Sequence, residues 1–246
     1  MVSHDDKSRS FGVAADLYQA GRPEYPVEAV AWMLESVGAN ARVVDVGAGT
    51  GKLTRAVLAA GAASVTAVDP DPLMLAGLHS VLPAVPVLEG TAESLPLADD
   101  SADAVVLGQA WHWVDPEAGS REIGRVLRDG GVLGLIWNIR DASIGWVARM
   151  SEIMHNSNAE EMISSGGPRV AAPFSTLESR SWEWSRGMTR SELLAMARSR
   201  SYLITAGPEE RARVEAGLEE LFDEIGAVGD AAVELPYITT AFRAVL

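Results

Sequence analysis

Short apolar runs alternate along the first half of the chain with segments in which apolar residues recur every three or four positions. The runs have the length and the β-branched character of buried strands, and the periodicity between them is that of amphipathic helices. This alternation predicts a doubly wound α/β fold with a mostly parallel sheet and helices on both faces. The strands predicted in this half are residues 42–46, 64–68, 85–88, 104–107 and 132–137.

Capping residues mark the helices between these strands. Pro26 opens a helix that ends before Gly38, and a second helix covers residues 52–60. Asp-Pro pairs at 71–72 and 115–116 open two more, because an aspartate accepts from the first free N–H groups and a proline fits the first turn. Each predicted strand end is therefore followed by a turn or loop that leads into a helix or the next strand.

The alternation loosens after Asn138. Thr189 followed by Glu192 forms a capping box, which predicts a helix start there. The further elements predicted are a helix at 143–158, a break at 164–168, a strand at 180–186, helices at 189–198 and 208–225, and a strand at 233–245. The two added strands complete a seven-stranded Rossmann-like sheet with an antiparallel carboxyl-terminal edge strand.

The segment Val43–Gly51 reads Val-Val-Asp-Val-Gly-Ala-Gly-Thr-Gly and joins the first strand to a helix. Glycines allow the backbone to turn sharply there and leave its N–H groups open to a ligand, although a plain tight turn is the simpler alternative. Asp69 ends the next strand, 22 positions after Gly47, where a carboxylate can hold the hydroxyls of a ribose. Because Asp71 caps the following helix, we expect Asp69 to be free for a ligand.

Composition narrows the possible functions. The 246 residues include no cysteine, which excludes thiol catalysis and thiolate metal sites, and no metal site is predicted. A net charge of −14 disfavours nucleic acid and anionic membrane surfaces as partners. No apolar run is long enough to span a bilayer and the first residues do not resemble a signal peptide, so we expect a cytoplasmic location.

The chain resembles the class I S-adenosylmethionine-dependent methyltransferases, particularly the small-molecule branch of trans-aconitate-methyltransferase-like and methyltransferase type 11 proteins. The resemblance implies S-adenosylmethionine as cofactor, S-adenosylhomocysteine as product and a small-molecule methyl acceptor as partner. Besides the glycine turn, the matching segments are Arg22-Pro-Glu-Tyr-Pro26, Val65-Thr-Ala-Val-Asp-Pro70, Glu89-Gly-Thr-Ala-Glu-Ser-Leu-Pro-Leu97, Gln109-Ala-Trp-His-Trp113 and Gly130-Gly-Val-Leu-Gly-Leu-Ile-Trp-Asn138.

Carried over by this resemblance, the glycine turn would line the methionine portion of the cofactor and Asp69 would hold its ribose. Pro70 and Met74 would flank adenine, and Thr91 stands where many relatives place an aspartate. The implied cofactor-binding residues are Tyr18, Arg22, Asp45, Gly47, Ala48, Gly49, Gly51, Asp69, Pro70, Met74, Thr91, Ala92, Glu93, Gln109 and Ala110.

A single methyltransferase domain over residues 1–246 is implied as well. Residues 1–38 would form a helical lid, residues 39–140 the cofactor-binding core, and residues 141–246 the acceptor-pocket helices and closing strands. The oligomeric state is not readable from the sequence.

His112 is the candidate catalytic residue, since it follows a strand at the edge where open α/β sheets bind ligands. It could act on the acceptor or simply support the neighbouring tryptophans. A carboxylic acid acceptor would need a cation, for which Arg22 and Arg140 are candidates, although each could instead form a surface ion pair. The candidate acceptor residues are Trp111, Trp113, Asn138 and Arg140, and Trp137 could join them.

Three other functions share parts of this pattern. A nicotinamide-dependent oxidoreductase would have its third glycine one residue later than Gly51. A methyltransferase acting on base amino groups would carry an Asn-Pro-Pro-aromatic or Asp-Pro-Pro-aromatic segment, which Gly108-Gln-Ala-Trp111 is not. A regulator that binds the cofactor without chemistry is the third alternative.

Overall fold

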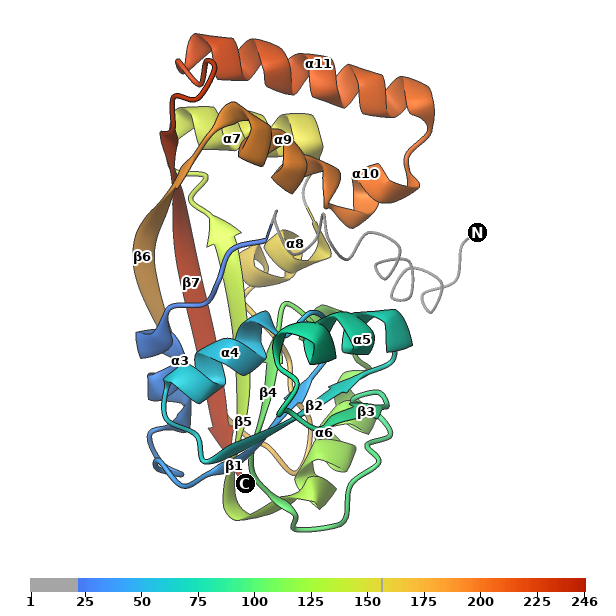
Figure 1. The fold of residues 1–246 in the computed structure, drawn as a ribbon. Coiled ribbons are helices and arrows are strands. Elements are labelled where there is room, and N and C mark those ends of the chain that lie inside the picture. Colours follow the sequence, from blue (N-terminus) through green and yellow to red (C-terminus); the bar gives the residue numbers. More distant parts are fainter. Residues whose placement is uncertain (1–21, 156) are drawn as a thin grey trace.

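The computed structural model describes residues 22–155 and 157–246. The strands are β1 (Arg42–Val46), β2 (Ser64–Asp69), β3 (Val87–Glu89), β4 (Ala102–Gly108), β5 (Leu127–Arg140), β6 (Glu178–Met188) and β7 (Val233–Val245). They form one seven-stranded sheet in the order β3-β2-β1-β4-β5-β7-β6, flanked by helices (Figure 1). This confirms the predicted Rossmann-like α/β fold.

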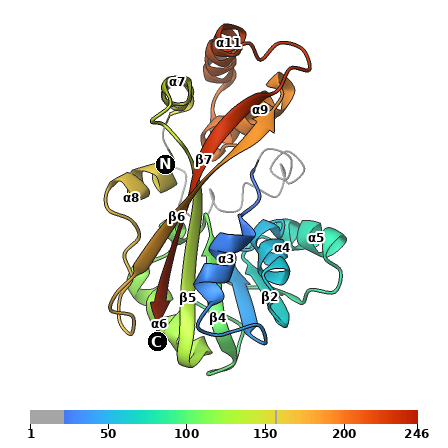
Figure 2. The same ribbon diagram turned by 90° about the vertical axis from the view of Figure 1, so that its left-hand side faces the viewer.

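Alternating side chains of the parallel strands bury opposite faces of the sheet. The helices α3 (Val27–Leu34), α4 (Lys52–Ala59) and α5 (Pro72–Val81) cover one face, where Val43 and Val106 pack. The helix α6 (Pro116–Val126) covers the other face, where Val44 and Val105 pack (Figure 2). Because β1 and β4 are buried on both faces, they read as continuous apolar runs in the sequence.

The last strand, β7, runs antiparallel to β5 and pairs with it from Val132–Val245 to Arg140–Tyr237. This confirms the predicted antiparallel carboxyl-terminal strand. Its other side pairs antiparallel with β6, which therefore takes the outermost position of the sheet. β5 begins at Leu127 and includes the glycine pair at 130–131 that the sequence places in a turn before the strand.

A second helical layer lies at the carboxyl edge of the parallel strands, at the top of Figure 1. It contains α7 (Gly145–Met154), α9 (Arg190–Arg198), α10 (Ser201–Thr205) and α11 (Pro208–Glu224), and α8 (Asn158–Ser164) lies below it, toward the sheet. The helices α7, α9 and α11 share a core that includes Met150, Leu193 and Phe222. Since β5 and β6 lead directly into α7 and α9, this layer stands over the same sheet edge as the glycine turn.

The predicted helix at 143–158 is confirmed over α7, which ends at Met154, but the separate helix α8, which begins at Asn158, was not predicted. His155 has a φ of 58°, which ends α7. Ser157 and Glu160 then form a capping box that starts α8. The short helix α10 was not predicted.

The predicted lid is described only in part. Residues 1–21, which include the candidate Tyr18, lie outside the described residues. From Arg22 the chain runs in an extended segment to Pro26 and enters α3. In the part of the chain that the structure describes, no helix has the length and apolar character needed to cross a membrane.

Candidate active site

The glycine turn between β1 and α4 is open on the side that faces the pocket. Gly47 and Gly49 have φ values of 67° and 54°, which L side chains rarely adopt. A Cβ atom on Gly47 would lie 2.8 Å from that of Ala110, so the turn closely approaches the loop that follows β4. A Cβ atom on Gly49 would meet no described atom within 4 Å. Gly49 is therefore where a ligand can come nearest to the backbone.

Asp69 ties this turn to the end of β2. One carboxylate oxygen accepts the backbone N–H of Gly49 at 2.8 Å and the other accepts that of Asp71 at 2.9 Å. Asp71 caps α5 as predicted, by accepting from Leu73 at 2.9 Å. The expectation that Asp69 is free for a ligand is wrong in this respect, because both of its oxygens already have a partner. A carboxylate oxygen has two lone pairs, so each can accept one more hydrogen bond.

Asp45 lies beneath the turn and does not line the pocket. Its side chain is fully buried and accepts a 2.6 Å hydrogen bond from the Thr54 hydroxyl of α4. Its second oxygen has no partner within the described structure. Burial raises the pKa of Asp45 to about 7, against the opposing hydrogen bond from Thr54, and burial also raises the pKa of Asp69 to about 6.

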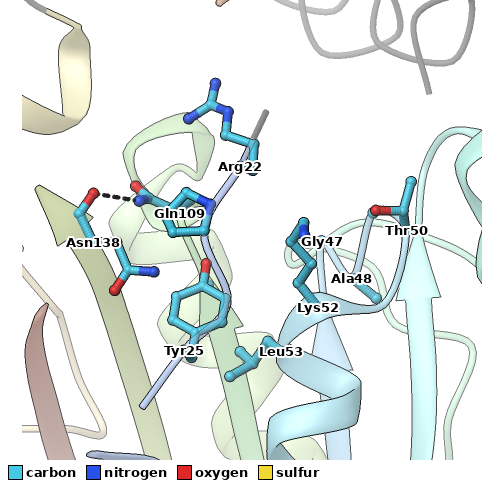
Figure 3. Close-up of a pocket in the computed structure, with 12 residues that line it drawn as sticks. Arg22, Tyr25, Gly47, Ala48, Thr50, Lys52, Leu53, Gln109 and Asn138 are labelled. Atoms are coloured by element: carbon cyan, nitrogen blue, oxygen red, sulfur yellow. Dashed lines mark hydrogen bonds between the residues drawn. The ribbon is translucent and has the colours of Figure 1, made fainter. Parts of the chain in front are cut away.

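The pocket lies between the glycine turn, the loop after β4, the end of β5 and the segment before α3 (Figure 3). The site residues predicted from the sequence include Arg22, the glycine turn, Gln109 and Asn138. Lys52, Leu53 and Gly108 were not predicted, and Pro23 and Tyr25 were noted only as part of the segment Arg22–Pro26. The residues that line the pocket are Arg22, Pro23, Tyr25, Gly47, Ala48, Gly49, Thr50, Lys52, Leu53, Gly108, Gln109 and Asn138.

Asn138 fastens three parts of this pocket together. Its backbone carbonyl accepts from the Gln109 side chain at 2.7 Å, and its amide nitrogen donates to the carbonyl of Glu24 at 3.1 Å. Its side-chain oxygen accepts from the Thr239 hydroxyl of β7 at 2.6 Å. Asn138 is only 7% exposed, and its side-chain nitrogen and oxygen both have hydrogen-bond partners within the protein. We therefore infer that it positions the pocket walls.

Lys52, at the start of α4, holds the segment that precedes α3. Its ammonium lies 2.8 Å from a carboxylate oxygen of Glu24, and Arg55 donates to the same oxygen at 3.0 Å. Burial lowers the pKa of Lys52, while Glu24 opposes that shift. The segment's Tyr25 reaches β4, where a Cβ atom on Gly108 would lie 2.6 Å from the tyrosine hydroxyl. The Arg22-Pro-Glu-Tyr-Pro26 motif was the sequence signal for this contact, but its partners are far away in the chain.

The loop after β4 contains a short 3₁₀ turn, Trp111–Trp113. Trp111 is 2% exposed, belongs to the core and donates its indole N–H to the carbonyl of Arg169. Trp137 is fully buried, and its indole N–H lies 3.4 Å from Nδ1 of His112. His112 packs against Trp113, with ring centroids 4.9 Å apart. The two most buried tryptophans thus support the loop, whereas His112 and Trp113 are half-buried.

The residues predicted around adenine lie beside Asp69. Met74 is buried in α5, Pro70 is half-buried, and the backbone N–H of Gly90 donates to the carbonyl of Asp69 at 3.3 Å. The loop at 91–93 follows directly. Within it Thr91 is exposed, Ala92 is buried, and the Glu93 carboxylate accepts from the backbone of Asp115 at 3.0 Å.

Arg140 ends β5 in the second helical layer and is not among the pocket-lining residues. Its guanidinium is 3% exposed and lies 2.7 Å from a carboxylate oxygen of Glu160 in α8. The other oxygen of Glu160 lies 2.8 Å from the Arg200 guanidinium. Glu160 and Arg200 were not predicted from the sequence. The capping-box spacing of Ser157 and Glu160 was a signal for Glu160, and Arg200 had none. The described residues contain no group of side chains that could hold a metal ion.

Comparisons with known proteins agree with this geometry. Residues 44–135 match the family model of a methyltransferase domain. The chain is 42% identical to an uncharacterized methyltransferase of Mycobacterium tuberculosis, over 99% of this chain and 98% of the relative. It is 33% identical to an uncharacterized methyltransferase-like protein of Schizosaccharomyces pombe, over 92% and 91% of the two chains. The chain belongs to the methyltransferase family.

Solved structures share the fold. A protein of Anaeromyxobacter dehalogenans, provisionally assigned as a type II methyltransferase, superimposes with a TM-score of 0.66 at 22% identity, over 90% of this chain and 97% of that one. Phosphoethanolamine N-methyltransferase 2 of Haemonchus contortus, solved with S-adenosylmethionine, gives 0.54 at 18% identity, over 100% and 60%. These likenesses confirm the class I methyltransferase fold, and membership of the trans-aconitate-methyltransferase-like branch stays a prediction.

The raised pKa of Asp45 predicts a pH-dependent stability. A carboxyl whose pKa is higher in the folded state binds more protons there, so stability falls as pH rises between its ordinary value and about 7. Replacing Asp45 by asparagine removes this contribution. Between pH 5 and pH 8 the wild type should lose about 2 kcal/mol more unfolding free energy than Asp45→Asn, measured by urea titration. Parallel stability curves for the two proteins would contradict the assignment.

The open space at Gly49 predicts a selective loss of cofactor binding. In Gly49→Val the side chain should occupy that space and weaken binding of S-adenosylmethionine at least tenfold, measured by calorimetry. Gly61→Val is the matched control, because Gly61 also has a positive φ and open surroundings but lies outside the pocket. An equal loss in both variants would show that backbone strain, and not space at Gly49, decides affinity.

Proposed function

We propose that this methyltransferase transfers the methyl group of S-adenosylmethionine to a carboxylate of a small organic acid, giving a methyl ester and S-adenosylhomocysteine. The methyltransferase family supports the reaction class. The observation that supports an acidic acceptor is the proximity of two arginines, Arg22 in the pocket and Arg140 at the end of β5. Burial lowers the pKa of Arg140, Glu160 opposes the shift, and the charge of Arg22 adds to it. The chain as a whole has a net charge of −14, so the positive charge of Arg22 and Arg140 is confined to this part of the molecule.

The pocket residues fit the cofactor. The turn leaves open space at Gly49, although the backbone N–H groups of Gly47, Ala48, Gly49 and Gly51 already donate within the protein. Asp69 retains two lone pairs for the hydroxyls of a ribose. Gln109 and Ala110 border the turn on the side proposed for the amino acid end. We assign the adenine surroundings to Pro70, Met74 and the loop at 91–93, because these residues lie beside Asp69, the proposed ribose ligand. The division into lid, cofactor core and acceptor layer is part of the same proposal.

Methyl transfer needs little acid or base chemistry from this chain. When bound, the cofactor supplies a methyl group that is carried by a sulfonium, and loss of this methyl group leaves a neutral thioether. A carboxylate acceptor would take up this methyl group on its oxygen as the carbon–sulfur bond broke, and it would not first have to lose a proton. The protein's task is therefore to orient the acceptor in line and to exclude water, which can supply most of the acceleration.

His112 fits an acceptor that needs no base. Indole N–H is only a donor, so Trp137 requires an unprotonated Nδ1 on His112. The neutral ring then carries its proton on Nε2, where it donates a hydrogen bond and does not accept a proton. A hydroxyl acceptor would instead need an unprotonated Nε2 that accepts the hydroxyl proton. We therefore propose that His112 orients an acceptor oxygen as a donor.

A nicotinamide-dependent oxidoreductase is less well supported than methyl transfer. Its fingerprint places a glycine at the position of Lys52, whose ammonium instead binds Glu24. A regulator that binds the cofactor without turnover differs from the enzyme only in activity, so an assay must separate them.

Radiolabelled methyl transfer across a panel of carboxylic acids, phenols and amines tests the proposal. The label should appear in carboxylic acids as a base-labile ester. Transfer confined to phenols or amines would contradict the acceptor class. Silence across the panel with intact binding of S-adenosylmethionine would favour the regulator.

The donor role predicts how His112 variants behave. His112→Ala should lower turnover about tenfold without loss of cofactor binding, since one hydrogen bond to a charged oxygen is removed. His112→Gln should recover part of the rate, because glutamine can still donate. The measurements are turnover against pH and calorimetric cofactor affinity. An acidic fall in wild-type rate that disappears in His112→Gln would instead indicate a general base.

A further inference from the structure

A row of side chains continues from the pocket across the three outer strands. Asn138, which lines the pocket, is paired with Thr239, and Thr239 is paired with Trp182. Paired residues of antiparallel strands point to the same face, as do residues two apart along one strand. The next row on that face is Arg140, Tyr237 and Trp184, about 7 Å further along the strands. The Tyr237 ring stacks on Trp184 with centroids 5.0 Å apart.

The carboxylate of Glu160 lies between the guanidiniums of Arg140 and Arg200. Each oxygen of Glu160 accepts from one guanidinium, and the same carboxylate caps α8 through Ser157. This arrangement fixes both arginines, because Glu160 is anchored to the helix that it starts.

The positive charge of this cluster is not balanced by described residues. Two guanidiniums share one carboxylate, and the Arg140 Nε is buried without a hydrogen-bond partner. Arg200 is 12% exposed, and among the described residues it donates only to Glu160. Burial and the charge of Arg140 both lower the pKa of Arg200. Since buried charges are normally paired, the cluster has the chemistry of a site that awaits an anion.

Tyr237 adds a neutral donor to this charge. Within the described part of the chain its hydroxyl makes no hydrogen bond, although the residue is 3% exposed. Burial raises the pKa of Tyr237, while the charges of Arg140, Arg186, Arg200 and Arg22 lower it. Four positive charges therefore act on one phenol group. Holding α8 uses the two ion pairs of Glu160 but does not use the Tyr237 hydroxyl.

We propose that Arg140, Arg200 and Tyr237 bind a second acidic group of the acceptor, so that the substrate is an acid with two anionic groups. The group near Arg22 and the glycine turn receives the methyl, and the other is held one row further along the sheet. This inference rests on the proposed function and narrows its substrate class. The second group is recognised by charge and hydrogen bonds and is not itself changed.

Matched acceptors test this proposal on the full chain. Hexanoate and hexanedioate have equal length and differ in the second carboxylate, so kcat/KM for the two acids gives a preference ratio. The wild type should prefer the diacid at least tenfold. Tyr237→Phe and Arg200→Gln should each lower that ratio at least tenfold. Arg198→Gln is the control, because Arg198 lies two positions before Arg200 in the chain and forms an exposed ion pair with Glu215 outside the cluster. It should leave the ratio unchanged.

A wild-type ratio near one, or ratios unchanged in both variants, would overturn the second site. Thermal melting of Tyr237→Phe distinguishes a folding defect from a lost substrate contact. The melting temperature should not change, because this variant removes only a hydroxyl that has no partner among the described residues. If no carboxylate is methylated, the proposed function fails by itself. The second site is then decided by calorimetric titration of hexanedioate into protein saturated with S-adenosylhomocysteine. Wild-type binding that Tyr237→Phe and Arg200→Gln weaken tenfold supports it, and no binding overturns it.

Discussion

The hydrogen bond from the Gly49 N–H to the Asp69 carboxylate connects the parts of this protein that form its cofactor site. It joins the turn after β1 to the end of β2, and the second oxygen of Asp69 holds the start of α5 through Asp71. A buried carboxylate with two backbone donors fixes its surroundings, because losing either donor would leave a polar group unsatisfied. The pocket floor is thus held by hydrogen bonds within the protein, and one of them orients the backbone of Gly49 beside the open space.

Local sequence signals predicted most of this floor. The five parallel strands, the Asp71 cap and the antiparallel last strand follow from apolar runs, capping residues and alternation, which depend on near neighbours in the chain. The pocket residues Gly49, Gln109 and Asn138 were predicted because they lie in segments that resemble the methyltransferase family. The error at the end of α7 was also local, since the positive φ of His155 ends the helix four residues before the predicted boundary at Asn158.

The acceptor side depends on contacts that no local pattern reveals. Glu160 meets Arg200 across 40 positions and Arg140 across 20, and Asn138 meets Thr239 across 101. Trp111 was expected at the acceptor, but the 3₁₀ turn directs it into the core. The long outer strands explain why these residues meet, because they extend past the parallel sheet and support the helical layer over the pocket. The methyl donor and its acceptor can therefore be held by different parts of one fold.

Calorimetric titration of S-adenosylmethionine into Asp69→Ala tests the central claim most directly. Asp103→Ala is the matched control. Asp103 is also a buried acid that joins strands, because it pairs with Arg42 and Arg128, but it lies at the amino ends of the parallel strands, away from the pocket. The account predicts that the affinity falls at least tenfold in Asp69→Ala and stays at the wild-type value in Asp103→Ala. Wild-type affinity in a folded Asp69→Ala protein would contradict it.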